Sequence, residues 1–322
     1  MVAGIDIIAA RGRLRPRLAP TPLLDTAWLS EMTGGRALLK LESVNVTRSF
    51  KIRGALNALT RLGERAEVAG PAPVIVTASA GNHGRAMAQA ARWLGLPLHV
   101  FTPSTAPRAK TAAIRRLGAT LHDEAPTYDE AERLARSFAA AHDAVFISPY
   151  NHPDVIAGAG TIGLELVEAC PDLGTVVIPL GGGGLASGVA VALRTAAPRA
   201  RVVAIETEAS TPFTTALAHG RITPITVGPT LADGLAGNLE DGAMTFELVR
   251  DLVDEVATVS EADLVAAMGA LAVEEQLVVE GSAAVGVAAV MAGLIRPAPG
   301  PLAVLVTGAN IDFDTWRRVV HA

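Results

Sequence analysis

Lysine is scarce in this chain, and one lysine stands where it could do chemistry. Lys40, Lys51 and Lys110 are the only lysines among the 27 basic Lys and Arg residues. A deprotonated lysine amine can attack a carbonyl carbon, whereas arginine stays protonated. Lys51 lies in SVNVTRSFKIRGALNAL, where Thr47 or Ser49 could cap a helix whose positive end would disfavour the ammonium form. This position predicts an amine nucleophile, with an ordinary surface lysine as the alternative, and we expect Lys40 and Lys110 to be solvated.

A second candidate site is the run of four glycines from Gly181 to Gly184 in TVVIPLGGGGLASGVAVALRTA. A glycine turn between a strand and a helix offers backbone amides and a helix N-terminus to an anion, so this segment predicts a phosphate site. The segment also fits the dinucleotide pattern GxGxxG/A through Ala186, and Glu206 follows where a ribose-binding acid would lie. A nicotinamide-dependent oxidoreductase is therefore an alternative, and a turn without any ligand is another.

The elements that must position these residues alternate between short β-branched runs and Ala/Leu-rich runs. This alternation predicts βαβ units and a mostly parallel sheet, hence an α/β fold. The expected strands are residues 74–77, 98–102, 144–148, 175–180, 201–206 and 302–308. Apolar residues recur on one helical face in residues 52–59 and 87–94.

Polar or glycine-rich segments follow five of these strands. They are residues 77–82, 148–152, 181–184, 206–212 and 307–310. Ligands bind at the carboxyl ends of parallel strands, so we expect these segments to line one site.

The composition excludes several classes of function. A net charge of -5 and a pI near 5.8 leave no basic surface for nucleic acid, so we expect none as a partner. Cys170 is the only cysteine, which rules out an intrachain disulfide and favours a cytoplasmic location. We find neither an export signal nor an apolar stretch long enough to span a membrane, so we expect no membrane partner.

Eight segments in order make the chain resemble the threonine/serine dehydratase family of fold type II pyridoxal-phosphate enzymes. They are SFKIRGA (49–55), SAGNHG (79–84), PDVIAGAGTIGLEL (153–166), PLGGGGLASG (179–188), ADG (232–234), TFEL (245–248), VDEVATVSE (253–261) and TGANID (307–312). The resemblance implies two open, mostly parallel-sheet α/β domains like those of tryptophan synthase β, with the cofactor between them. It places the large domain in residues 1–64 and 151–322 and a small inserted domain in residues 65–150, and it implies a homodimer or homotetramer.

The resemblance also implies a role for individual residues. Lys51 would form the Schiff base with pyridoxal 5'-phosphate, and Phe50 would pack beside the ring. Asn82 would hydrogen-bond the ring hydroxyl, and Thr307 would face the pyridine nitrogen with a neutral hydroxyl, which favours elimination over transamination. The phosphate would be bound by Gly181, Gly182, Gly183, Gly184 and Leu185. The substrate would contact Ser79, Ala80, Gly81, Asn82, His83 and Tyr150. For His83, a capping or core histidine is the alternative.

The implied reaction is the conversion of a small β-hydroxy-L-amino acid (threonine, serine or a bulkier analogue) to a 2-oxo acid and ammonia by β-elimination. Lys51 would take the Cα proton as general base. Racemases of the family carry a serine where this chain has Ala80, so we expect little racemisation. A racemase, a β-replacement enzyme and a non-catalytic pyridoxal-phosphate binding protein are the alternatives.

Three departures from the family pattern concern the substrate and a metal. Arg48 stands where relatives carry glycine, and with Tyr150 in the pocket it leaves the identity of the hydroxy-amino acid open. Glu206 resembles a carboxylate that anchors a divalent cation in some relatives, but Pro212 stands where the second acidic ligand would be. We therefore assign no metal.

Overall fold

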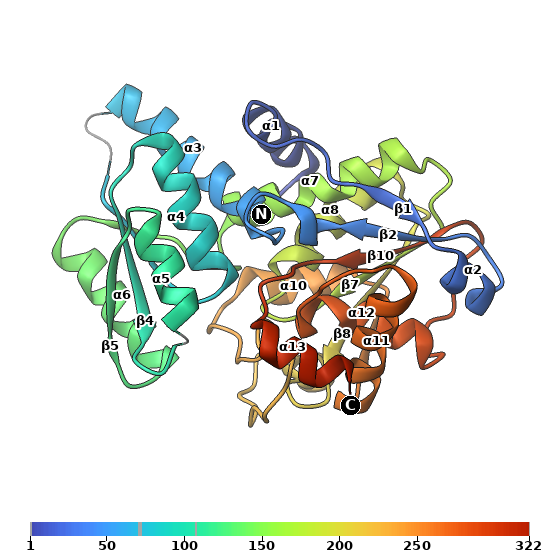
Figure 1. Cartoon of the computed structure of the whole chain (residues 1–322). Coiled ribbons are helices and arrows are strands. Elements are labelled where there is room, and N and C mark those ends of the chain that lie inside the picture. The colour runs from blue at the N-terminus through green and yellow to red at the C-terminus, as the bar shows by residue number, and fades with distance from the viewer. Residues whose placement is uncertain (1, 70–72, 107, 322) are drawn as a thin grey trace.

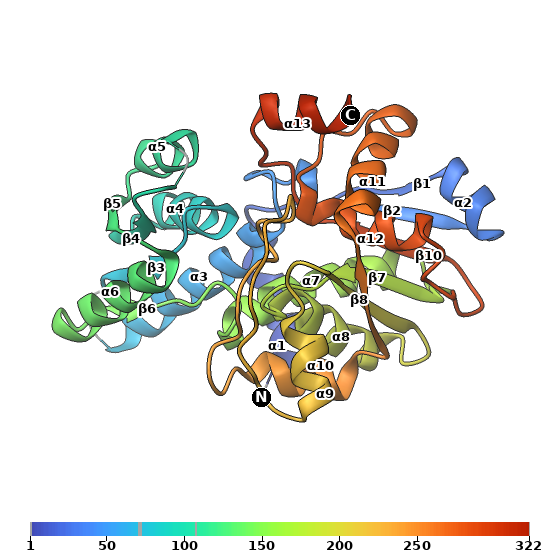
Figure 2. The same ribbon diagram turned by 90° about the horizontal axis from the view of Figure 1, so that it is seen from below.

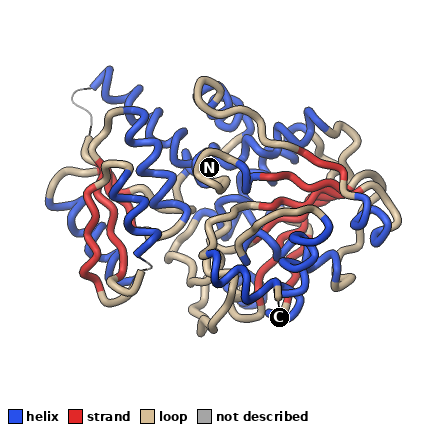
Figure 3. The backbone as a smooth tube through the Cα atoms, viewed as in Figure 1, coloured by secondary structure: helices blue, strands red, loops and turns tan. Residues whose placement is uncertain are grey.

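The computed structural model describes residues 2–69, 73–106 and 108–321, which form two parallel-sheet units (Figure 1). Helices cover both faces of each sheet, as Figure 2 shows from below and the secondary-structure colouring of Figure 3 shows in the first view. The expected α/β fold with two mostly parallel sheets is confirmed. Within these described ranges, no helix combines the length and the apolar character needed to cross a membrane.

The larger sheet contains six strands, β1 (Leu23–Asp25), β2 (Ala37–Leu41), β7 (Thr175–Pro179), β8 (Arg201–Thr207), β9 (Glu255–Val259) and β10 (Leu302–Val306). Their order is β1-β2-β10-β7-β8-β9, and only β1 runs antiparallel to its neighbour. β10 therefore lies between β2 and β7. This arrangement joins the two ends of the chain in one sheet and places the segment after β10 beside the start of the helix that carries Lys51.

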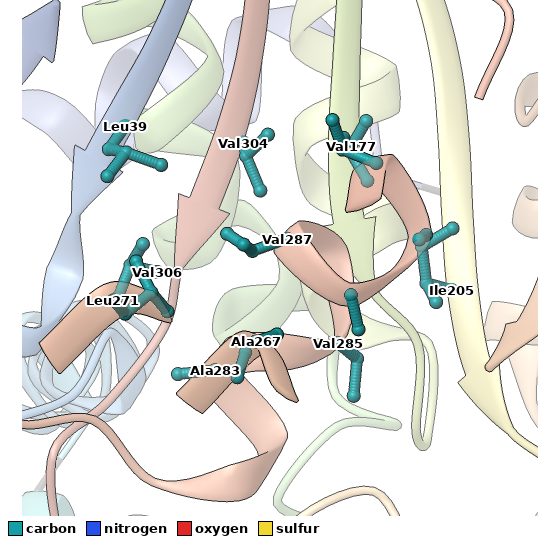
Figure 4. Packing of buried hydrophobic residues seen from close by; sticks show 14 of the residues in the cluster. Leu39, Val177, Ile205, Ala267, Leu271, Ala283, Val285, Val287, Val304 and Val306 are labelled. Carbon is teal, nitrogen blue, oxygen red and sulfur yellow. The ribbon is translucent and has the colours of Figure 1, made fainter. Parts of the chain in front are cut away.

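Two layers of helices bury this sheet. Helices α2 (Ala27–Thr33), α11 (Glu261–Glu274) and α12 (Gly281–Met291) share one apolar core with it, and α13 (Phe313–Val320) packs on α11. Figure 4 shows α12 lying across the strands, with Val285 and Val287 directed among the strand side chains. The close approach depends on small residues, since a Cβ on Gly286 would lie 2.8 Å from Val304 Cγ1. On the other face lie α7 (Pro153–Ala169), α8 (Gly184–Ala196) and α10 (Met244–Leu252), and α1 (Gly4–Leu14) packs on α7.

The smaller sheet has four parallel strands, β3 (Ile75–Ala78), β4 (Leu98–Pro103), β5 (Thr120–Ala125) and β6 (Val145–Phe146), in the order β5-β4-β3-β6. Helices α3 (Lys51–Ala69), α4 (Asn82–Leu94) and α5 (Arg108–Arg116) contribute to the core on one face, and α6 (Tyr128–Ala141) covers the other. All four strands lie inside the predicted inserted segment of residues 65–150. Helix α3 begins before that segment, yet Ile52 and Leu56 share a core with Ile75. The domain boundary itself stays a prediction.

Candidate active site

Lys51 is the first residue of α3, and the end of β10 fixes its position. The Phe50 amide donates to the carbonyl oxygen of Thr307 at 3.0 Å, and Ser49 forms a β-bridge with Gly308. The expected helix start at Lys51 is thus found, but the suggested cap by Thr47 or Ser49 is wrong. The Thr47 hydroxyl faces the Ser49 carbonyl oxygen, and the Ser49 hydroxyl is buried without a partner. Thr47 lies in a turn, and Ser49 pairs with Gly308 instead of with the start of the helix.

The amine of Lys51 is shielded from solvent by its neighbours. Its Nζ donates to the Pro149 carbonyl oxygen at 2.8 Å and lies 5.1 Å from the centre of the Phe50 ring. Burial lowers the pKa of Lys51 to about 8, and the negative charge of Glu280 opposes this shift. A substantial fraction of the amine is therefore neutral near pH 7 to 8, which is the form that attacks a carbonyl carbon.

A buried ionic network holds the first turns of α3 in place. Arg53, 2% exposed, bonds to Glu42 at 2.8 Å and to Glu165 of α7 at 2.6 Å. Lys40 of β2 completes the network through an ion pair of 2.6 Å with Glu165. The expectation that Lys40 is solvated is therefore wrong, because it is 2% exposed and paired. Lys110 is not fully solvated either, since its half-buried side chain pairs with Asp233 at 2.7 Å.

The glycine loop joins β7 to α8, as the sequence pattern predicts. Gly183 has a φ of 83°, a left-handed conformation that favours glycine. A Cβ on Gly182 would lie 2.4 Å from Tyr150 Cγ, and one on Gly183 would lie 2.5 Å from Phe213 Cζ. Leu185, 6% exposed, packs in the core of the large sheet, so only its backbone is available to a ligand. The loop thus presents bare backbone amides at the N-terminus of a 13-residue helix, which is an arrangement that binds phosphate.

We expect Gly182→Ala to weaken pyridoxal phosphate binding by about tenfold or more, because the new methyl group must displace Tyr150 or the loop itself. The dissociation constant is measured by following the visible absorbance during cofactor titration. Gly12→Ala is a matched control, since a Cβ at Gly12 meets nothing within 4 Å. Equal dissociation constants for the two variants would show that the loop does not bind the phosphate.

The segment from Ser79 to His83 connects β3 to α4, and Asn82 is the first residue of the helix. The Asn82 amide nitrogen donates to Glu280 at 2.6 Å. His83 does not cap the helix, because it is 2% exposed and both ring nitrogens lack a partner. Burial and the nearby charge of Lys51 hold the pKa of His83 well below its usual value, so its imidazole is neutral. Ala80 and Gly81 are half-buried in the same turn.

Tyr150 packs against the glycine loop. Its ring fills the space next to Gly182, its backbone and Cβ lie next to Gly184, and its hydroxyl accepts a hydrogen bond of 2.7 Å from the Glu240 amide. The neighbouring residue Pro149 contacts Lys51. The loop that contains Pro149 and Tyr150 therefore connects the amine to the glycine loop. Thr307, 3% exposed, directly follows β10 beside Phe50.

Arg48 also has a left-handed backbone, with a φ of 59°. Its amide donates to Asn45 and its carbonyl oxygen accepts from Ala309, which closes a tight turn before Lys51. The side chain is exposed, and its charge helps to lower the pKa of Arg85 on α4. The guanidinium therefore lies near the start of α4 as well as in solvent.

Glu206 contributes to helix capping rather than to a ligand site. Its two carboxylate oxygens accept hydrogen bonds from the amides of Phe213 and Thr214 and from the Thr214 hydroxyl, at 2.6 to 2.9 Å, at the start of α9 (Pro212–His219). A carboxylate engaged in this way is not free to bind a ribose, which argues against the dinucleotide interpretation. Phe213, which follows the predicted segment 206–212, packs against Gly183. Direct contacts join the segments 77–82 and 307–310 through Asn82 and Asn310, and the segments 148–152 and 181–184 through Tyr150 and Gly182.

Sequence reasoning missed three side chains around Asn82, namely Glu280, Asn310 and Arg85. Asn310 donates to the Asn82 side-chain oxygen at 2.6 Å and accepts from Arg85 at 2.6 Å. Glu280 is the single charge in the apolar run LVVEGSAAVGVAAV, and such an isolated acid is a signal that could have identified it.

The residues of this site are suited to bind pyridoxal phosphate. The amine of Lys51 can bind its aldehyde, the bare amides of the glycine loop can bind its phosphate, and buried polar atoms of Ser49 and His83 lack partners beside the amine. A pair of parallel α/β units with a buried amine and an anion-binding glycine loop defines the class of fold type II pyridoxal-phosphate enzymes.

Comparison with known proteins supports this class. Residues 14–308 match the family described as pyridoxal-phosphate dependent enzyme. The L-threonine ammonia-lyase of Thermotoga maritima is 40% identical, over 100% of this chain and 79% of that protein. The beta-hydroxyaspartate dehydratase of Paracoccus denitrificans is 36% identical, over 96% of each chain. The structure of maize serine racemase has a TM-score of 0.91 and 31% identity, over 99% of this chain and 97% of that one.

The chain thus belongs to the threonine/serine dehydratase family, and it is a pyridoxal-phosphate dependent ammonia-lyase. The predicted family, cofactor and class of enzyme are confirmed, and the oxidoreductase alternative is excluded.

Proposed function

We propose that the protein eliminates the β-hydroxyl group of a small β-hydroxy-L-amino acid and releases a 2-oxo acid and ammonia. The observation that carries this proposal is Lys51, an amine with a pKa lowered to about 8 that donates to Pro149, the residue next to Tyr150, which packs against the glycine loop. The threonine ammonia-lyase and hydroxyaspartate dehydratase relatives support threonine, serine or a bulkier analogue as the substrate.

When bound, pyridoxal phosphate supplies an aldehyde for amine attack and an electron-withdrawing ring that acidifies the Cα proton of the amino acid. Lys51 would hold the cofactor through its Nζ, and the same Nζ would serve as the general base that takes the Cα proton of the substrate. Backbone amides of residues 181–184 orient the phosphate, and the turn from Ser79 to His83 receives the substrate carboxylate at a helix N-terminus. Thr307 offers a hydroxyl rather than a carboxylate to the ring nitrogen.

Ala80 decides between elimination and racemisation in this proposal. Racemisation needs a proton donor on the face of Cα opposite to Lys51, and the methyl group of Ala80 cannot provide one. The relatives include serine racemases, so this alternative has to be tested directly.

The test uses the protein loaded with pyridoxal phosphate and a panel of L-threonine, L-serine and L-threo-3-hydroxyaspartate. We expect 2-oxo acid and ammonia in equal amounts from at least one substrate. We expect D-amino acid, followed by chiral chromatography, to form about ten times more slowly or less. Rapid L-to-D conversion would identify a racemase. Cofactor absorbance with no turnover of any substrate would identify a binding protein.

We also propose that the protein forms a homodimer or homotetramer, which light scattering would test.

A further inference from the structure

Glu280 is a buried carboxylate to which the proposed reaction gives no role. It precedes α12, is 5% exposed, and reaches Asn82 across the two sheet units. A Cβ on Gly308 would lie 2.2 Å from Glu280 Oε1, so glycine at this position leaves room for the carboxylate. The Asn310 amide donates to Glu280 Oε2 at 3.2 Å and helps to orient it.

Glu280 ends a chain of three side-chain hydrogen bonds that begins at Arg85. Arg85 donates to Asn310 Oδ1, Asn310 Nδ2 donates to Asn82 Oδ1, and Asn82 Nδ2 donates to Glu280 Oε1, each at 2.6 Å. A guanidinium can only donate hydrogen bonds, and an ionised carboxylate can only accept them. Asn310 Nδ2 also donates to the Thr47 carbonyl oxygen at 2.9 Å. The donor Arg85 and the acceptors Thr47 and Glu280 therefore determine together the orientation of both amides.

This orientation determines what Asn82 can offer to a ligand. Its oxygen is engaged by Asn310, while its nitrogen has two hydrogens, of which Glu280 uses one. The free hydrogen is a donor. A donor beside the cofactor ring stabilises a ring oxygen that carries negative charge, because hydrogen bonds to charged groups are the stronger ones.

We propose that Glu280 and Arg85 are positioning residues that make Asn82 present an N–H group to the ring oxygen of pyridoxal phosphate, which is thereby held as the oxyanion. The inference rests on the proposed function, since it uses the predicted place of Asn82 opposite the ring hydroxyl. The proton of the ring hydroxyl then resides on the Lys51 nitrogen, so the total number of protons is unchanged. The loaded enzyme is expected to show the visible band of this form rather than the near-ultraviolet band of the neutral ring oxygen.

Protonation of Glu280 should favour the neutral ring oxygen over the oxyanion. Burial raises the pKa of Glu280 to about 7, Asp233 adds to this shift, and Asn82, Lys110 and the Asn310 amide oppose it. The positive charge of Lys51 also faces the carboxylate. Below this pH the carboxyl group carries a proton and no longer requires a donor from Asn82. The visible band should therefore weaken as the pH falls through about 7.

The test measures the ratio of the two absorbance bands in the loaded protein from pH 6 to pH 9. At pH 8.5, we expect Glu280→Gln to lower the ratio of visible to near-ultraviolet absorbance about tenfold, because glutamine has an NH2 donor in place of one of the two oxygens that accept from Asn82 and the Asn310 amide. The pH dependence near 7 should disappear in this variant. Arg85→Met should also lower the ratio, since it removes the donor at the other end, and Arg85→Lys should restore it. Arg92→Met, an exposed position on the same helix, should leave the spectrum unchanged.

The outcomes separate the inference from the proposed function. No visible band in the wild-type protein with added cofactor would contradict the proposed site itself. A normal wild-type band that Glu280→Gln and Arg85→Met leave unaltered would overturn the inference while the proposed function stands. If Glu280→Gln fails to bind cofactor, the Arg85→Met and Arg85→Lys pair decides, because Arg85 is joined to Asn82 through Asn310 and Arg85→Lys keeps a donor at this end.

Discussion

Replacing Lys51 with alanine is expected to lower kcat for ammonia release by roughly four orders of magnitude or more, since general base catalysis alone contributes up to about 10⁴-fold. The alanine side chain can neither bind the aldehyde of the cofactor nor accept the Cα proton. Ammonia and 2-oxo acid are measured with the best substrate of the panel. An alanine variant with normal turnover would contradict both roles of Lys51.

Two further measurements distinguish chemistry from folding in this variant. Lys51→Arg keeps the positive charge but cannot form the covalent bond, so we expect it to be as inactive as Lys51→Ala. Borohydride reduction of the loaded wild-type protein should attach the cofactor to the peptide that contains Lys51. Because Lys40 and Lys110 are the only other lysines, mass spectrometry of three peptides is sufficient, and label on Lys40 or Lys110 instead would contradict the assignment.

The second large effect concerns stability. We expect Arg53→Met to lower the free energy of unfolding by about 3–5 kcal/mol, because it leaves the buried carboxylate of Glu42 without its ion-pair partner and leaves Glu165 with Lys40 alone. The positive charge of Arg53 is a principal reason that the pKa of Glu42 is lowered despite its burial. Denaturant unfolding followed by circular dichroism measures the change.

Arg36→Met is the matched control for this prediction. Arg36 forms an ion pair of 2.6 Å with Asp25, but both side chains are more than half exposed, so its loss should change the unfolding free energy far less. Equal effects of Arg36→Met and Arg53→Met would show that the buried network does not hold α3 in place.

Most strands with dense β-branched residues could be predicted from the sequence, although β9 (EVATV) was missed. β7 and β10 lie within the expected ranges, and β8 extends one residue beyond its range. The apolar faces of α3 and α4 are found as expected. β5 was missed because TLHDEA forms an edge strand with few apolar residues. β2 was missed because Lys40 interrupts the short run ALLKL. A lysine can occupy a buried strand only with a partner, and that partner, Glu165, lies 125 residues away in the sequence.

In the candidate site too, some residues could be predicted from the local sequence and others could not. Positions that form part of a local pattern, such as Lys51 at a helix start and Gly181 to Gly184 at a strand end, could be predicted with their surroundings. The chain from Arg85 through Asn310 and Asn82 to Glu280 joins three distant segments. The sequence marks Asn82 and the isolated acid Glu280 one by one, but only tertiary packing brings the four side chains together, so their hydrogen bonds could not be predicted.

The place of β10 between β2 and β7 has a consequence for synthesis on the ribosome. The smaller sheet is complete once residue 146 has emerged, whereas the larger sheet lacks an interior strand until about 160 further residues have been translated. At about 5–20 residues per second, this takes roughly 10 to 30 s. During that interval β2 and β7 have no shared neighbour, and Lys51 lacks the Thr307 segment against which it is positioned. The nascent chain should therefore acquire its cofactor only after translation of β10, while its smaller sheet is already folded.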